Sequence, residues 1–326
     1  MSIFFALVFP AFLRGQNQAP GVSVMSSPQE GRLQRAHSFE GDLRSLPQMP
    51  AEKLEKPEFK VPGTDPVAYP GTSSPTQRSL ALATNVLPGS GKPAPPAGKS
   101  FEGLDFATWG AGRAADASGD VGAQYYIQTI NAAVGVYDKS DGSRVAGFTL
   151  NALMSQGDFG NLCDSANLGE PVVVYDTFEQ RWIITDFAFA LSGDQAAAPA
   201  FQCFAVSRSG DPVGGGWNFY SIQVSGGAGD APRIGIWPDG LYMSANIFSV
   251  GADSVFQNAR LWAFNKAEMY AGSPTVQAFW FDAPSTESTL LPGNARLQTG
   301  TPAAGSPDYF TAVGQFLNAV SVYKLH

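Results

Sequence analysis

Short β-type runs recur along the chain from about residue 105 to its end. They are rich in Val, Ile, Phe, Tyr and Trp and are separated by clusters of Gly, Asp, Asn, Ser and Pro, which is typical of strands joined by turns. Only one segment of this region, 265–271 (NKAEMYA), is compatible with a turn of helix. The pattern therefore predicts an all-β domain over residues 101–326.

The β-type runs fall into four groups that repeat at roughly 50–60 residues, with about four strands in each group. The groups cover residues 119–152, 168–225, 230–283 and 290–326. Such a repeat predicts a β-propeller of four-stranded antiparallel blades, and a β-sandwich is the alternative. Because the fourth group stops after its third strand, we expect an incomplete propeller. It would be either a truncation of a longer protein or a ring that closes by edge pairing with another chain.

The N-terminal part of the chain differs in texture from the repeat region. Residues 1–19 contain the apolar run 3–13 (IFFALVFPAFL), which has the length of a signal-peptide core and is too short to span a bilayer. We interpret residues 1–19 as a signal peptide, with a chance apolar tail as the alternative. Residues 20–100 are rich in Pro, Ser, Gly and Gln without apolar periodicity, and they are predicted to form a disordered linker.

Charge and cysteine content narrow the environment and the partners of the protein. The net charge is −8 and no basic stripe is present, which argues against a nucleic-acid ligand. The two cysteines, Cys163 and Cys203, form an even pair that is compatible with a disulfide in an exported chain, and two separate buried thiols are the alternative. Together with the apolar N-terminal run, they predict a secreted or cell-surface location with no transmembrane span.

Three carboxylates hold similar places before the strand taken as innermost in each blade. They are Asp120, Glu170 and Asp230, and we expect them to gather at one mouth of a central channel. Convergent carboxylates are suited to Ca²⁺, so the sequence offers a calcium or ligand site, whereas turn capping is the alternative for each residue. Arg233 is the arginine expected to lie nearest to this channel as a ligand-binding residue.

Catalytic machinery is hard to assemble from this composition. The only histidines are His37, in the predicted linker, and His326, the last residue. A Ser-His-Asp or Cys-His arrangement within the repeat region is therefore nearly excluded. No catalytic residue is predicted, and an enzyme built on this chain would be a carboxylate-dependent glycosidase or lyase.

Several motifs resemble those of large, uncharacterised secreted bacterial β-propeller proteins, over residues 101–326. The segment 209–217 (SGDPVGGGW) also resembles the Asp-box of sialidase-like propellers, with one extra residue after its Asp. The resemblance implies architecture and export, and it carries no known activity. It rests on residues 101–104 (FEGL), 119–131 (GDVGAQYYIQTIN), 136–139 (VYDK), Cys163, 170–176 (EPVVVYD), 181–182 (RW), 202–210 (QCFAVSRSG) and 233–242 (RIGIWPDGLY).

These features together predict a secreted or cell-surface β-propeller that acts as a binding or scaffold module. Carbohydrate or protein is the expected ligand. Tryptophans such as Trp262 and Trp280 are expected mostly in the core between blades, and a platform for stacking on sugars is the alternative role.

Overall fold

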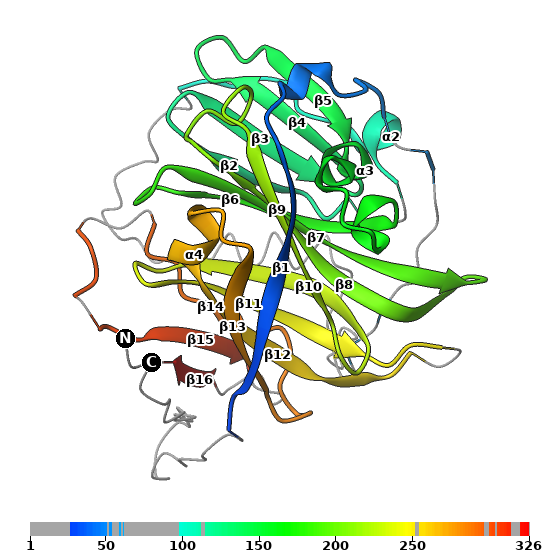
Figure 1. Ribbon diagram of the computed structural model, residues 1–326, viewed down its shortest axis with the longest axis vertical. Coiled ribbons are helices and arrows are strands. Elements are labelled where there is room, and N and C mark those ends of the chain that lie inside the picture. The colour runs from blue at the N-terminus through cyan, green and yellow to red at the C-terminus, as the bar shows by residue number, and fades with distance from the viewer. Residues whose placement is uncertain are drawn as a thin grey trace, which may run out of the picture.

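The protein is all-β, as predicted, and its strands form three sheets (Figure 1). The computed structural model describes residues 27–50, 52–53, 59, 61, 98–111, 115–251, 254–296, 300–303, 305–313 and 320–325. The predicted signal peptide, residues 1–19, lies outside the described residues.

The largest sheet has nine antiparallel strands in the order β10-β11-β12-β13-β1-β9-β8-β7-β6. Its two edge strands, β6 and β10, contact each other, so the sheet is nearly closed and barrel-like. Its strands are β1 (Gln29–Phe39), β6 (Asn167–Asp176), β7 (Arg181–Ser192), β8 (Gln195–Ser207), β9 (Trp217–Gln223), β10 (Ala228–Ile236), β11 (Gly240–Phe248), β12 (Phe256–Asn265) and β13 (Thr275–Asp282).

Two smaller antiparallel sheets complete the strand content. One has the order β2-β3-β4-β5 and the other β14-β15-β16. Their strands are β2 (Ser118–Val121), β3 (Tyr125–Ile130), β4 (Ala133–Asp138), β5 (Arg144–Thr149), β14 (Leu291–Pro292), β15 (Asp308–Val313) and β16 (Val320–Leu325). The strand groups β2–β5, β6–β9, β10–β13 and β14–β16 thus follow the four groups expected from the sequence.

Helices are short and lie in the connections. They are η1 (Leu43–Ser45), α2 (Phe106–Trp109), α3 (Leu150–Met154), η2 (Ser155–Gly157), η3 (Leu162–Asp164) and α4 (Lys266–Tyr270). The helical turn expected at 265–271 is confirmed as α4, where the Asn265 side chain accepts a hydrogen bond from the N–H of Glu268. None of the helices in the described part of the chain has the length and apolar character needed to cross a membrane.

Strand β1 corrects the prediction of a disordered linker for part of residues 20–100. In Figure 1 it crosses the front of the molecule, and it pairs with β9 on one side and β13 on the other. Leu33 is the only fully buried side chain of this strand. Its sequence, QEGRLQRAHSF, therefore shows no alternation of apolar and polar residues. Main-chain hydrogen bonds to two neighbours hold this strand in place, and hydropathy does not report them.

The apolar runs are long because several strands are buried on both faces. In β7, Ile183 and Phe187 belong to one hydrophobic cluster, whereas Trp182 and Ile184 belong to another. A strand covered on both sides reads as a nearly continuous apolar run rather than as an alternating one. The second and third strand groups therefore share a core.

A buried ion pair also joins the second and third groups. The Lys266 ammonium in α4 lies 2.9 Å from the Asp176 carboxylate at the end of β6, and both side chains are almost completely buried. The Tyr270 hydroxyl donates a hydrogen bond of 2.8 Å to the same carboxylate. Burial raises the pKa of Tyr270 well above its usual value, so the hydroxyl remains a donor.

The predicted disulfide between Cys163 and Cys203 is confirmed. It joins η3 to β8 across 40 residues of sequence, and both cysteines are fully buried. Closing a loop of this length stabilises a fold by about 3–4 kcal/mol.

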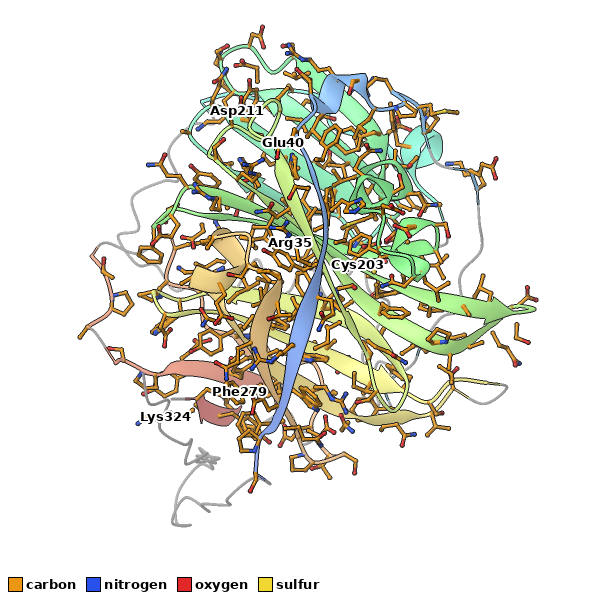
Figure 2. All side chains as sticks on the ribbon, viewed as in Figure 1. Arg35, Glu40, Cys203, Asp211, Phe279 and Lys324 are labelled. Atoms are coloured by element: carbon orange, nitrogen blue, oxygen red, sulfur yellow. A yellow bond between two sulfur atoms is a disulfide. The ribbon has the colours of Figure 1, made fainter. Side chains whose placement is uncertain are left out.

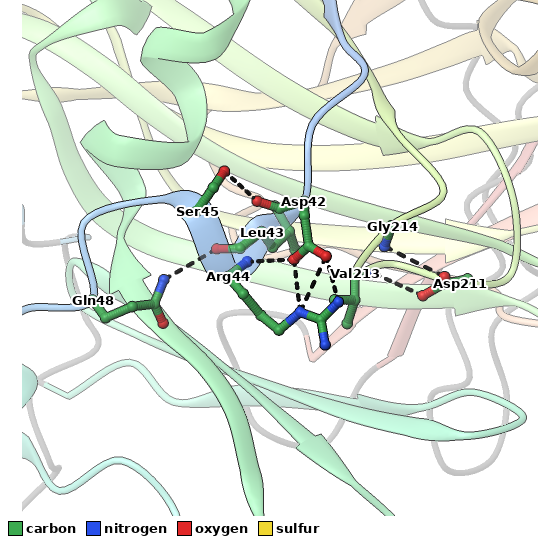
Figure 3. Close-up of polar contacts among 8 residues, drawn as sticks. All are labelled: Asp42, Leu43, Arg44, Ser45, Gln48, Asp211, Val213 and Gly214. Atoms are coloured by element: carbon green, nitrogen blue, oxygen red, sulfur yellow. Dashed lines mark hydrogen bonds and ion pairs between the residues drawn. The ribbon is translucent and has the colours of Figure 1, made fainter.

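The Asp-box-like segment is a structural turn between β8 and β9. The Asp211 carboxylate accepts hydrogen bonds from the N–H groups of Val213 and Gly214 (Figure 3). Trp217 is fully buried and donates its indole N–H to the carbonyl of Pro212. The Val213 carbonyl accepts from the N–H of Leu43, which anchors the segment that follows β1.

We predict that Leu33→Ala lowers the free energy of unfolding by about 2–5 kcal/mol, because it opens a cavity in the shared core. Gln34→Ala is the matched control on the same strand, since Gln34 is exposed, and it is expected to stay within about 0.5 kcal/mol of the parent. Urea denaturation of the full chain measures both. Equal, small effects of the two variants would show that β1 contributes nothing to the core.

Candidate binding site

Four residues with left-handed backbone occupy equivalent positions in the four strand groups. They are Asp116, Glu170, Ala231 and Thr289, with φ between 41° and 52°. In each group, the residue two positions later pairs with a hydroxyl residue of the second strand. The pairs are Ser118 with Thr129, Val172 with Thr185, Arg233 with Ser244, and Leu291 with Thr311.

The left-handed residues are tied from one strand group to the next. The Glu170 N–H donates to the Asn131 side-chain oxygen, and the Ala231 N–H donates to the Glu170 carboxylate, each at 2.5 Å. The Thr289 N–H donates to the Asn246 side-chain oxygen at 2.8 Å. Left-handed backbone costs about 1–2 kcal/mol for a residue with a side chain, and these bonds offset that cost.

A cavity of about 580 Å³ lies where these segments meet. This volume falls within the range of small-ligand pockets. Every strand group contributes to the lining, which consists of Asp116, Ala117, Ser118, Glu170, Pro171, Val172, Ala231, Arg233, Ile234, Leu291, Pro292 and Asn294.

The charged lining residues make the cavity asymmetric. Asp116 and Glu170 supply carboxylates, and the Asn131 amide donates a hydrogen bond to the Asp116 carboxylate. Arg233 supplies a guanidinium, which donates to the carbonyl of Pro232 at 2.9 Å. Because Ser118, Val172 and Leu291 hold the place of Arg233 in the other groups, the arginine departs from the repeat.

Two of the four predicted site residues lie in this cavity, and two do not. Glu170 and Arg233 both line it. Asp120 lies further along β2, where its carboxylate accepts from the Tyr175 N–H at 2.6 Å. Asp230 lies before the bulge of β10 and pairs in register with Asn246.

The expected calcium site of Asp120, Glu170 and Asp230 is therefore wrong as a set. Within the described ranges, no three His, Cys, Asp or Glu residues are grouped so that they could hold a metal ion. Strands β6 and β10 have the same register shift, between Gly169 and Val172 and between Asp230 and Arg233, so the structural counterpart of Glu170 is Ala231, and Asp230 corresponds to Gly169.

Sequence reasoning missed Asp116, Ser118 and Asn294 as lining residues. A usable signal was present, because Glu170 and Ala231 are each followed by proline, at Pro171 and Pro232. Aligning the groups on these prolines places Glu170 opposite Ala231. Asn294 follows a two-residue strand that carries too little apolar pattern to be aligned in this way.

Strand β10 packs closely against the segment that follows β14. A Cβ at Gly235 would lie 2.1 Å from the carbonyl oxygen of Gly293, so only glycine permits the approach of β10 to the segment after β14. Arg296 reaches from the fourth group to the first and donates to the Asp120 carboxylate at 2.7 Å. Their side chains are 15% and 7% exposed, so this ion pair is largely buried.

Asp308 is a buried acid beside this closure. Its carboxylate accepts from its neighbour's N–H, that of Tyr309, at 2.7 Å, and it lies next to Gly293. Burial, reinforced by the charge of Asp239, raises the pKa of Asp308 to about 8. The group is therefore protonated in the folded protein at neutral pH.

Comparison with models of known protein families, with curated proteins and with solved structures gives no match to this chain. The resemblance to secreted bacterial β-propeller proteins stays a prediction.

We predict that Arg296→Ala lowers the free energy of unfolding by about 3 kcal/mol, because it leaves the buried Asp120 carboxylate without its cation. The matched control is Arg44→Ala, which removes the exposed ion pair between Arg44 and Asp42 (Figure 3). Urea denaturation compares the two variants. A loss for Arg296→Ala no larger than that of the control would contradict a closing role for the Arg296 ion pair.

We predict that Asp308→Asn changes the pH dependence of stability. The unfolded chain ionises Asp308 near pH 4, whereas the folded protein holds this proton up to about pH 8. Stability of the parent is therefore lost as pH rises through this window, by on the order of 1 kcal/mol per pH unit. The melting temperature of Asp308→Asn, relative to the parent, should rise from pH 4 to pH 8.

The control for this pH series is Asp141→Asn, which alters an exposed carboxylate in a surface turn. Its melting temperature relative to the parent should show no such rise. A flat difference for Asp308→Asn over the same pH range would mean that Asp308 is ionised in the folded protein.

Proposed function

We propose that this chain is a secreted or cell-surface binding module, built as a four-bladed propeller whose fourth blade has three strands among the described residues. The equivalent left-handed residues and the bonds between successive groups support this arrangement. Contacts of β6 with β2 and β10, and of β10 with β14, further support a ring of innermost strands. In this reading, β1 is an additional strand between the outer strands of the second and third blades.

The buried disulfide supports export, because structural disulfides persist in oxidising compartments. The apolar run at residues 3–13 supports the same proposal.

The ligand would bind in the axial cavity lined by all four groups. The observation that carries this proposal is the placement of Asp116, Glu170 and Arg233 in one cavity of about 580 Å³. Carboxylates and a guanidinium in one cavity supply both hydrogen-bond acceptors and donors, which together suit a polar ligand such as an oligosaccharide.

A second function is favoured by one specific observation, the sharing of this cavity by Asp116 and Glu170. Glycoside hydrolysis uses two carboxyl groups that flank the bond to be cleaved. A glycosidase or lyase would then use this pair as acid and base or nucleophile, and Arg233 would hold the substrate.

Binding is tested with a panel of neutral and charged oligosaccharides, using thermal shift followed by calorimetry. We expect at least one compound to raise the melting temperature of the parent, and its affinity to fall at least about tenfold in Glu170→Gln and in Arg233→Ala. Arg44→Ala is the control and should bind as the parent does. If every compound that binds the parent also binds Glu170→Gln and Arg233→Ala with unchanged affinity, the axial cavity is not a binding site.

The enzymatic alternative is tested by analysing the products of the same oligosaccharides after prolonged incubation. Cleavage that falls by at least about a hundredfold in Glu170→Gln would establish it over simple binding. Binding without cleavage by the parent would leave the binding module as the function.

A further inference from the structure

A second groove, separate from the axial cavity, lies where β1 separates from β9. β1 pairs with β9 only from Gln34 to Phe39, whereas its pairing with β13 runs from Gln29 to Gln34. β9 continues past this point through Ile222 and Gln223, so the two strands diverge as a fork (Figure 1). A cavity of about 490 Å³ occupies the fork.

Aromatic side chains from three separate segments line this groove. Phe159 follows η2, Phe201 lies on β8, and Trp280 lies on β13, and each is partly exposed. The indole of Trp280 fits beside β1 because residue 31 is glycine, where a Cβ would lie 2.4 Å from the ring. The buried indole N–H has no hydrogen-bond acceptor among the described residues.

Uncharged amide and hydroxyl side chains line the groove beside these rings. Asn161 donates to the Ser221 hydroxyl at 3.1 Å, and Gln34 and Gln223 present exposed amides. Amides and hydroxyls both donate and accept hydrogen bonds, as the hydroxyls of a sugar do.

The charge of the groove is opposite to that of the chain. Arg32 and Arg35 line it, and no Asp or Glu is among its lining residues, although the net charge of the chain is −8. The Arg35 guanidinium is held by the Gly272 carbonyl, and Figure 2 shows Arg35 on β1 where the strand crosses the molecule. Arg32 has only a loose pairing with Glu30, at 3.8 Å, and its side chain is 52% exposed.

We propose that this groove binds an acidic saccharide, a uronate-containing oligosaccharide of about two to three units in length. The aromatic rings pack on the apolar faces of the sugar rings, the amides bond to hydroxyls, and Arg32 pairs with a uronate carboxylate through parallel N–H bonds. The site shares no residue with the axial cavity, so it goes beyond the function proposed above.

The test titrates the full-length protein with trimers of galacturonate and of glucuronate, by calorimetry and tryptophan fluorescence. A galactose trimer controls for the carboxylates, and pentaglutamate controls for non-specific attraction of anions. We expect a uronate trimer to bind with a dissociation constant below about 1 mM, and to bind at least about tenfold more tightly than both control compounds.

Substitutions at two exposed residues locate the site without destabilising the fold. Arg32→Ala and Gln223→Ala are each expected to weaken uronate binding, by at least about tenfold and threefold respectively. Arg233→Ala, in the axial cavity, should bind uronate as the parent does, which separates this proposal from the preceding one. Circular dichroism and the melting temperature verify that the variants are folded.

Three results would overturn the proposal. They are the absence of uronate binding by the parent up to about 10 mM, unchanged binding by Arg32→Ala, and pentaglutamate binding as tight as that of the uronates. Loss of uronate binding in Arg233→Ala alone would assign the acidic sugar to the axial cavity instead.

Discussion

Main-chain pairing along β1 is the interaction on which the shape of this protein depends. Without it, β6–β9 and β10–β13 are two four-stranded sheets whose outer strands, β9 and β13, each have an unpaired edge. An unpaired edge invites association with other chains, so β1 both joins the sheets and protects them. The strand achieves this with one fully buried side chain, Leu33, because backbone hydrogen bonds supply the rest.

A second constraint acts on the inner strands, where the groups meet. The left-handed residues Glu170, Ala231 and Thr289 each direct an N–H to a side chain of the preceding group. Such bonds fix the position of one group relative to the next, since a shift of either partner breaks the bond. Between the fourth and first groups, the ion pair of Arg296 with Asp120 makes the connection.

Both proposed binding sites lie where the chain departs from its repeat. One lining position of the axial cavity is shared by all four groups, and there Arg233 stands where the other groups have Ser118, Val172 and Leu291. The groove at the β1–β9 fork likewise exists because one strand leaves the register of its neighbour. The Glu170 carboxylate accepts the hydrogen bond from the Ala231 N–H, and Glu170 also lines the axial cavity.

The strand content, the four strand groups, the helical turn α4 and the disulfide between Cys163 and Cys203 could all be predicted from the sequence. These are local or compositional features, because strand period, turn chemistry and cysteine pairing leave direct marks in the sequence. Three features become visible only in the folded chain: β1 is a strand, Asp116 rather than Asp120 lines the cavity with Glu170, and Asp120 pairs with Arg296. Each of these depends on hydrogen-bond register between segments far apart in the chain, and a register difference of one residue turns a side chain to the other face of a strand.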